Sequence, residues 1–451
     1  MRTLWRVLLV SFLFATSWAS PQQAHAGNTD GILLGDDASL MGGAVTAIVS
    51  DGSALWYNPA GLRHVSRNTV DISVTAYSLR LYRIPDAITG GGMSANADVN
   101  EVTVIPSALS YVRTTDGGLR IGFGLFTTAL SDYSQVSELQ FTDPPTGLGW
   151  EWLVALENRV AVYHGLLGVA WSANKKLHFG VTGDISYVGA TQSSQLGGGL
   201  IADQTTGEAL FAGTESMRNS LTGVGLGLGV GLMWEPTPAF SLGAAFQTAS
   251  YLVFQSFQQQ AVASAGIAPP DVPGTIIIET SNVDESSGEF DQFEPYRLRF
   301  GIAYHFRKGT LSLDSDMQVA ERIDSSKWDT TFNGRIGLLL NLSDAVSLGL
   351  GAFTDRAPLR EQPTDFGESL VDFYGFTTGV KLRKTKKFAE TENSDSIAFE
   401  TTVAFRFAVG TGDFSGFAVI DNSNESELLT PITTDITIYE MSIYIGGGLR
   451  F

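Results

Sequence analysis

From Asn68 onward, apolar and polar residues alternate in runs of roughly 10 to 18 residues that are separated by turns, a pattern that predicts β-strands. The stretch 221–234 has the clearest pattern. Val224, Leu226, Leu228, Val230, Leu232 and Trp234 share one face, and Gly223, Gly225, Gly227, Gly229 and Gly231 share the other. An apolar face opposite a face of small or polar residues suits a membrane barrel strand, with lipid outside and a lumen inside. Strands of a soluble β-sandwich also alternate, but they are usually nearer five or six residues long.

Taken in order, the alternating runs predict an all-β protein, a transmembrane antiparallel β-barrel of about 14 strands. The even number is the one expected of bacterial barrels. The predicted strands are 69–82, 102–113, 119–130, 157–173, 176–192, 219–234, 239–257, 293–307, 310–320, 330–342, 345–354, 370–383, 396–409 and 434–451.

The connections between these strands fall into two classes. Those after even-numbered strands are short: 114–118, 174–175, 235–238, 308–309 and 343–344. Those after odd-numbered strands are mostly long: 83–101, 131–156, 193–218, 258–292, 355–369 and 410–433. Outer-membrane barrels have short periplasmic turns and long outer loops, so both ends of the chain are predicted to be periplasmic. The link 384–395 is an exception, because it is long although it follows an even-numbered strand, where the other connections are short.

The first 26 residues have the pattern of a secretory signal peptide. Arg2 and Arg6 form a basic region, 7–18 is apolar, and Ala24-His25-Ala26 fits a cleavage site, so residues 1–26 are predicted to be removed. A membrane anchor is the alternative, but the apolar run is shorter than the roughly 20 residues of a spanning helix.

Residues 27–67 precede the barrel, predicted as 68–451, and have no strand pattern. They include a glycine pair, an aromatic pair and a proline turn: Gly42, Gly43, Trp56, Tyr57, Asn58, Pro59 and Ala60. Irregular backbone at membrane depth is tolerated only where protein buries it or where it lines a cavity. A barrel of this size encloses a lumen. Residues 27–67 are therefore predicted to plug that lumen.

The stretches 42–44, 51–57 and above all Asn58-Pro59-Ala60-Gly61-Leu62, placed between a signal peptide and a barrel, resemble the FadL/TodX-like outer-membrane transporters of hydrophobic compounds. The resemblance implies a 14-stranded barrel closed by an N-terminal hatch with an Asn-Pro-Ala gate. It also implies passive uptake of a hydrophobic ligand, a long-chain fatty acid first and an aromatic hydrocarbon as the alternative. Barrels that assemble or anchor secreted proteins share a similar motif, so an assembly barrel without solute transport is the second hypothesis.

The net charge and the C-terminal residue indicate which binding partners to expect. The formal net charge of −19 argues against nucleic acid, whose phosphates require a basic surface. The last strand closes on an aromatic residue, Phe451, as in the assembly signal of bacterial outer-membrane proteins. The predicted location is the outer membrane of a Gram-negative bacterium, and the predicted partners are the hydrophobic ligand, outer-membrane lipid and the barrel-assembly machinery.

Catalytic chemistry is not predicted. His64, His164, His178 and His305 stand alone in the sequence, without a second ligand at metal-binding spacing, so no metal, cofactor or enzyme activity is expected. Asp314 and Asp316 alternate with apolar residues and are predicted to line a hydrated lumen wall, with a catalytic acid pair as the alternative. The basic run 381–387 is predicted to be a solvated turn, with lipid headgroup binding as the alternative.

Overall fold

The computed structural model describes residues 31–90, 93–142, 149–203, 208–267, 277–287, 292–319, 322–323, 326–327, 330–357, 369–387, 396–419 and 429–451. The predicted signal peptide and residues 27–30 lie outside these ranges. Among the described residues, no helix is both long and apolar enough to cross a membrane.

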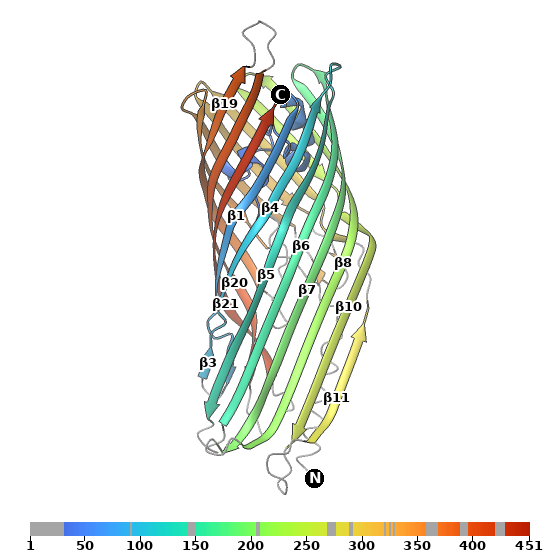
Figure 1. The fold of residues 1–451 in the computed structure, drawn as a ribbon, viewed down its shortest axis with the longest axis vertical. Coiled ribbons are helices and arrows are strands. Elements are labelled where there is room, and N and C mark those ends of the chain that lie inside the picture. The colour runs from blue at the N-terminus through green and yellow to red at the C-terminus, as the bar shows by residue number, and fades with distance from the viewer. Residues whose placement is uncertain are drawn as a thin grey trace.

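The wall is a closed antiparallel barrel of 14 strands, as the alternation predicts, and pairing of β1 with β21 closes it (Figure 1). The seventh wall strand is formed by β9 and β10 together. In order, the wall strands are β1 (Thr69–Arg83), β4 (Val99–Thr114), β5 (Arg120–Thr142), β6 (Gly149–Asn174), β7 (Leu177–Asp203), β8 (Glu208–Thr237), β9 (Phe240–Gln247) with β10 (Ser250–Ile267), β13 (Arg297–Phe306), β14 (Gly309–Gln318), β17 (Thr331–Asn341), β18 (Val346–Asp355), β19 (Ser369–Lys387), β20 (Ser396–Val419) and β21 (Leu429–Arg450).

Shorter strands accompany the wall. β11 and β12 pair with β10 and lead into β13, whereas β2 and β3 form a small hairpin that pairs with β20. Their bounds are β2 (Ile88–Gly90), β3 (Met93–Ala95), β11 (Ile277–Ser286), β12 (Gln292–Glu294), β15 (Arg322–Ile323) and β16 (Ser326–Lys327).

The wall has its apolar side chains outside and its polar side chains inside. On β8, Leu228 is 61% exposed and Val230 46%, and on β14 Leu313 is 51% exposed. Asp314 and Asp316, the neighbours of Leu313 on the opposite face of β14, are only 6% and 1% exposed. This distribution suits a wall whose outer face contacts lipid.

Several strands are longer than predicted. β5 pairs with β6 as far as Thr142 and Gly149, and β7 pairs with β8 as far as Asp203 and Glu208. The predictions of long loops at 131–156 and 193–218 are therefore wrong. Beyond the membrane both faces of a strand meet water, so the apolar alternation fades while backbone pairing continues. β19 and β20 likewise pair as far as Lys387 and Ser396. The predicted long link 384–395 is therefore reduced to residues 388–395, which lie outside the described residues.

The short turns 115–119, 175–176, 238–239, 307–308 and 342–345 each join consecutive wall strands. They lie at the end of the barrel where the backbone N–H of Phe451 donates to the carbonyl of Asn68, at 3.0 Å (Figure 1). By the usual asymmetry of such barrels, this short-turn end is the periplasmic one.

The outward face of β8 allows a direct test of lipid exposure. Leu228→Arg should lower the free energy of unfolding by about 2–4 kcal/mol relative to Leu228→Ala, because it places a charge in the hydrocarbon layer. Reversible denaturant unfolding of both variants in phospholipid vesicles measures the difference. Equal stability of the two variants would contradict the lipid-facing position of Leu228.

Candidate functional site

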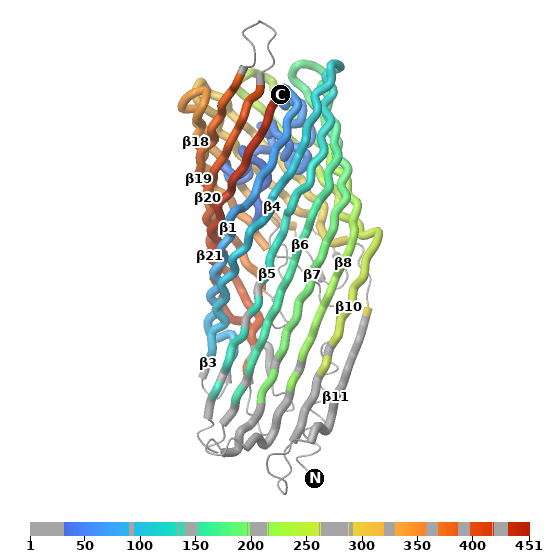
Figure 2. Tube along the Cα trace, viewed as in Figure 1, coloured from blue at the N-terminus to red at the C-terminus, as the bar shows by residue number. Residues whose placement is uncertain are grey.

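The N-terminal segment, Gly31–Val65, lies inside the barrel at its short-turn end (Figures 1 and 2). It has three short helices, α2 (Asp36–Leu40), α3 (Ala54–Tyr57) and the 3-10 helix η1 (Pro59–His64). α2 contacts β18 to β21, whereas η1 contacts β5 to β8. Its apolar side chains pack with those of the inner wall in one buried cluster, which includes Leu55, Trp56, Ile105, Phe126 and Leu166.

Asn58 is fully buried at the start of η1. Its Oδ1 accepts the backbone N–H of Ala60 at 3.1 Å, which caps the helix, and Pro59 suits the first helical position because it has no N–H to satisfy. Its Nδ2 donates to the carbonyl of Thr46 at 2.8 Å and to that of Leu232, on β8, at 3.1 Å. The side chain of Asn58 therefore joins two parts of the segment to each other and to the wall.

The glycine-rich face of β8 points inward, but only one end of it meets the N-terminal segment. A Cβ added to Gly231 would overlap Asn58 Oδ1 and lie 2.8 Å from Pro59 Cδ, whereas the nearest neighbour of one added to Gly229 would be Thr182 Cβ, at 3.7 Å. Gly223, Gly225 and Gly227 face other wall side chains, respectively Leu252 and Val188, Ser186 and Phe293, and Asp184.

Other wall glycines allow the same close approach to the segment. The pairs are Gly180 with Pro59, Gly243 with Thr46, Gly301 with Ala47, Gly337 with Met41, Gly349 with Leu40 and Gly351 with Gly42. A side chain at any of these wall positions would meet the segment's backbone or Cβ atoms. The segment therefore contacts the bare backbone of wall strands on several sides of the barrel.

The glycine pair of the segment, Gly42 and Gly43, adopts the left-handed backbone region, with φ of 63° and 80°. Only glycine takes this conformation without steric cost. Gly42 faces the backbone of Gly351 and Ala352 on β18, and Gly43 faces the side chain of Arg335 on β17. The pair thus forms a turn in which Gly42 fits against bare wall backbone and Gly43 fits against the side chain of Arg335.

The aromatic pair contacts a buried arginine of the wall. The guanidinium of Arg299, on β13, lies 5.3 Å from the Trp56 ring centre and 5.6 Å from that of Tyr57. The same guanidinium donates to the carbonyl oxygen of Trp56 at 2.8 Å. The Trp56 ring also packs against His164, with ring centres 4.9 Å apart. Arg299 therefore links the segment to the wall by both charge and hydrogen bonding.

Asp316 accepts hydrogen bonds from three arginines on two strands, β13 and β17. Arg297 Nε donates to both carboxylate oxygens at 2.8 and 2.9 Å, Arg335 Nη2 donates at 3.0 Å and Arg299 Nε at 3.3 Å. Asp314 Oδ2 accepts the backbone N–H of Thr46 at 2.7 Å. The prediction of a hydrated lumen wall is wrong here, because both carboxylates are buried and bonded to protein.

A second ionic contact joins α2 to β19. Lys381 donates to the Asp37 carboxylate, and the hydroxyl of Tyr444 donates to Asp36 Oδ1 at 2.9 Å. Burial alone would raise the pKa of Asp37, but the Lys381 ammonium outweighs it and lowers that pKa. Lys381 is buried, so the prediction of a solvated turn is wrong for this residue; Arg383 is bonded to Glu400 at the barrel rim.

Asp51 lies in the same segment, shortly before the aromatic pair Trp56 and Tyr57. The backbone N–H and the hydroxyl of Ser53 both donate to its Oδ1. Burial, helped by the neighbouring carboxylate of Asp37, raises the pKa of Asp51 to about 6. The segment therefore contains a carboxyl that changes charge near neutral pH.

Leu55 and Trp56 of the segment form the floor of a partly open recess between the segment and the inner wall, with about 530 Å³ of empty space when the open solvent at its mouth is included. Apolar and polar groups both line it. The apolar ones are Leu55, Trp56, Leu166 and Pro295, and the polar ones are Thr182, Asp184, Gln247, Thr248, Ser250, Glu294, Arg297 and Gln318. Asp184 is bonded to His164 Nδ1 at 2.9 Å. Such a recess suits a molecule that has both apolar and polar parts.

The ladder between β4 and β5 stops partway. It runs from Thr114↔Arg120 to Ala108↔Phe126, although both strands continue beyond this point. Pro106 has no N–H to donate, and its carbonyl accepts instead from the hydroxyl of Thr127 at 2.6 Å. The β5–β6 ladder shifts register between Thr127 and Ala129. The wall is thus locally irregular next to Pro106.

Phe451 is 47% exposed and directly follows β21 at the short-turn end of the barrel. Its role as an assembly signal stays a prediction.

Comparison with known proteins agrees with this architecture. No family model matches the sequence, and no curated protein matches it. Among solved structures, a Pseudomonas aeruginosa FadL homologue has 13% sequence identity and a TM-score of 0.60, over 94% of this chain and 100% of that one. The chain has the FadL/TodX barrel fold.

Two further barrels share this fold. The P. putida toluene transporter TodX has 15% identity and a TM-score of 0.57, over 94% of this chain and 99% of its own. The CymD monoaromatic hydrocarbon channel has 13% identity and a TM-score of 0.54, over 93% and 97%. With its lipid-facing outer surface, the chain is a multi-pass β-barrel protein of the outer membrane, and the predicted resemblance is confirmed at the level of the fold.

Gly231 and Gly229 form a matched pair for testing the contact between η1 and β8. Gly231→Ala should displace η1 and raise ion conductance through the barrel several-fold, because its methyl group overlaps Asn58. Gly229→Ala should conduct like the wild type, since its methyl group meets only open space and ordinary contacts. Conductance in planar bilayers measures both, and equal conductance of the two variants would contradict the contact.

The N-terminal segment should be held more firmly at acidic pH. Because the pKa of Asp51 is about 6 in the packed segment and ordinarily 3.8, the packed form binds the proton more tightly. Protonation then stabilises packing as pH falls from about 6 to about 4, and this contribution is lost as pH rises through about 6. Amide hydrogen exchange of residues 52–56, corrected for intrinsic rates, should show more protection at about pH 5 than at about pH 7.5. Asp51→Asn should remove most of that difference, and an unchanged difference would assign it to another group.

Proposed function

We propose that this protein is an outer-membrane channel for the passive uptake of hydrophobic small molecules, with the N-terminal segment as its hatch. The recess above Leu55 and Trp56 carries the proposal. It lies directly against the segment, and its floor is the part of the segment that would have to move for a ligand to pass.

Apolar burial provides the affinity in this proposal. A ligand that leaves water for the surface formed by Leu55, Trp56 and Leu166 gains roughly 25 cal/mol for each Å² of apolar area buried. No energy source is required, because the ligand moves down its own concentration gradient. TodX and CymD, which share this fold, are named as a toluene transporter and a hydrocarbon channel, and no catalytic role is proposed for this protein.

We propose a long-chain fatty acid as the first ligand class. The recess combines an apolar floor with polar side chains, which suits a long apolar chain with a polar end. Monoaromatic hydrocarbons are the alternative class, and TodX and CymD, which share the fold, are named for such compounds. A hydrocarbon would use the apolar floor alone.

Release of the ligand would require two local changes. Asn58 holds η1 against β8 through the carbonyl of Leu232, so loss of that hydrogen bond would free the gate. The β4–β5 ladder ends at Ala108, which makes this part of the wall the proposed exit for a ligand that leaves sideways into the bilayer. Hydrophobic compounds favour that route because they need not enter water.

Asn58→Ala tests the gate. It removes the cap of η1 and both anchoring hydrogen bonds, which weakens the closed arrangement by about 1–3 kcal/mol. Uptake of labelled oleate by a host without its own transporter should therefore rise several-fold above that of the wild type. Asn341→Ala is the control, because Asn341 is exposed at the end of β17, beside a short turn, and its side chain accepts a hydrogen bond from the nearby Ser347. It should leave uptake unchanged.

Parallel uptake of labelled toluene distinguishes the two ligand classes. If wild-type protein raises uptake of neither compound above the empty-vector level, transport is contradicted. A tightly bound partner protein on a barrel that carries no copurified lipid would instead support the assembly hypothesis.

A further inference from the structure

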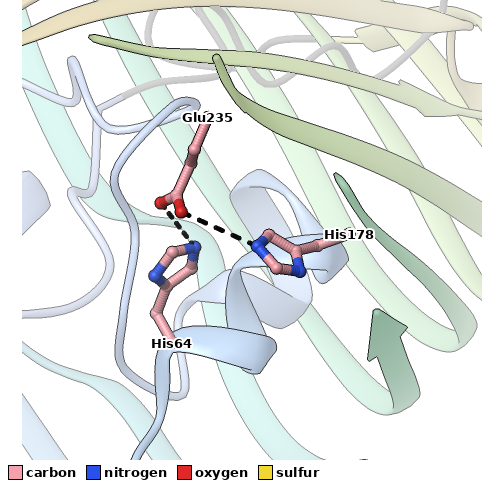
Figure 3. Close-up of side chains that lie close together, drawn as sticks. All are labelled: His64, His178 and Glu235. Atoms are coloured by element: carbon pink, nitrogen blue, oxygen red, sulfur yellow. Dashed lines mark ion pairs between the residues drawn. The ribbon is translucent and has the colours of Figure 1, made fainter. Parts of the chain in front are cut away.

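Three metal-ligating side chains, distant in sequence, meet at the short-turn end of the barrel (Figure 3). His64 ends η1, His178 begins β7 and Glu235 lies near the end of β8. His64 Nε2 is 3.4 Å from Glu235 Oε1, and His178 Nε2 is 3.7 Å from Glu235 Oε2. One ligand atom from each residue lies within 4.8 Å of the other two. Figure 3 shows the two imidazoles pointing toward the carboxylate from different elements.

The hydrogen bonds around the cluster leave the facing nitrogens available. His178 Nδ1 is 2.7 Å from Ser172 Oγ, which also accepts the Nε–H of Arg63 at 2.6 Å. A histidine ligand commonly donates its other ring N–H to such an oxygen, which leaves Nε2 as the ligating atom. His64 Nε2 is buried and makes no hydrogen bond, although it points at Glu235. A buried polar atom without a hydrogen bond is costly, and a metal ion at this point would satisfy it.

We propose that His64, His178 and Glu235 bind one divalent transition-metal ion, with Zn²⁺ as the best-matched metal. Two imidazole nitrogens and one carboxylate oxygen form an established ligand set for zinc. In tetrahedral coordination at about 2.1 Å, ligand atoms lie about 3.4 Å apart, so the side chains need only a small contraction. Water would complete the coordination from the periplasm.

The position of this site has a consequence for the N-terminal segment. His64 follows Asn58-Pro59-Ala60 in the same short helix, whereas the other two ligands belong to the wall. A bound ion would therefore tie η1 to β7 and β8 on the periplasmic side of the gate. Since the ion binds the packed segment better than a displaced one, it stabilises packing by mass action. The metal site does not depend on which ligand, if any, the barrel transports.

Metal titration of the purified full-length protein in detergent tests this proposal. After EDTA treatment, the protein is titrated with Zn²⁺ against a chromophoric chelator, and with Co²⁺ while its visible absorption is followed. The wild type should bind one equivalent of Zn²⁺, and Co²⁺ should show the intense bands of tetrahedral coordination. His64→Gln and Glu235→Gln should each weaken binding about 100-fold or more, since even the loss of an outer-shell partner costs 10–100-fold.

His305→Gln is the matched control. Its ring nitrogens lie 2.7 Å from Ser241 Oγ and 3.0 Å from Thr310 Oγ1, so it is a histidine of the same barrel end whose nitrogens are already bonded. It should bind Zn²⁺ like the wild type. Heat-modifiable gel mobility verifies that each variant is folded. The proposal is overturned if folded wild-type protein binds no stoichiometric Zn²⁺, or if folded His64→Gln binds it as tightly as wild type.

Discussion

The structure depends on one constraint, which is that a backbone inside a lipid bilayer must satisfy its own hydrogen bonds. A sheet can do this only by closing on itself, and here pairing of β1 with β21 removes the two free edges. Closure of fourteen strands leaves an interior wide enough for water. Such an interior must be filled or closed. The polar side chains of the inner wall and the N-terminal segment occupy it.

At the short-turn end, the N-terminal segment fills the interior, and its backbone packs directly against the backbone of the wall. A few buried charged side chains also join the two. Glycines on β7, β8, β9, β13, β17 and β18 permit contact distances that no other residue would allow. Arg299 and Lys381 then join the segment to the wall. Buried ion pairs contribute little net stability against an apolar alternative, but removal of one partner is expensive. These contacts therefore specify one arrangement of the segment more than they strengthen it.

Much of the fold could be predicted because alternation depends on local residue order. The strand number, the inward glycines of β8 and the barrel class all come from the period of two. The ends of β5 and β7 could not be predicted in this way, because outside the membrane the apolar face no longer marks the strand. Arg297 and Arg299 could have been recognised, since they alternate with Leu298 and Phe300 as Asp314 and Asp316 alternate with Leu313.

The contacts of the site that could not be predicted from the sequence are those between residues that meet only when the barrel closes. Lys381 and Asp37 are 344 residues apart and meet only because β19 and α2 are neighbours in the barrel. His64, His178 and Glu235 likewise have no local spacing that marks them as a group. Such pairs depend on strand order and register around the wall, which a single sequence does not specify.

The hydrogen bonds between Asp316 and the arginines of β13 and β17 also favour one register of β14 with its neighbouring strands. A slip of one residue along β14 would turn every side chain to the opposite face, which would send Asp316 into hydrocarbon and bring Leu313 into the lumen. Three arginines from β13 and β17 would then lose their shared acceptor. The charges of the lumen wall therefore favour the observed register, because the shifted register would leave Asp316 unpaired in hydrocarbon and the arginines without their shared acceptor.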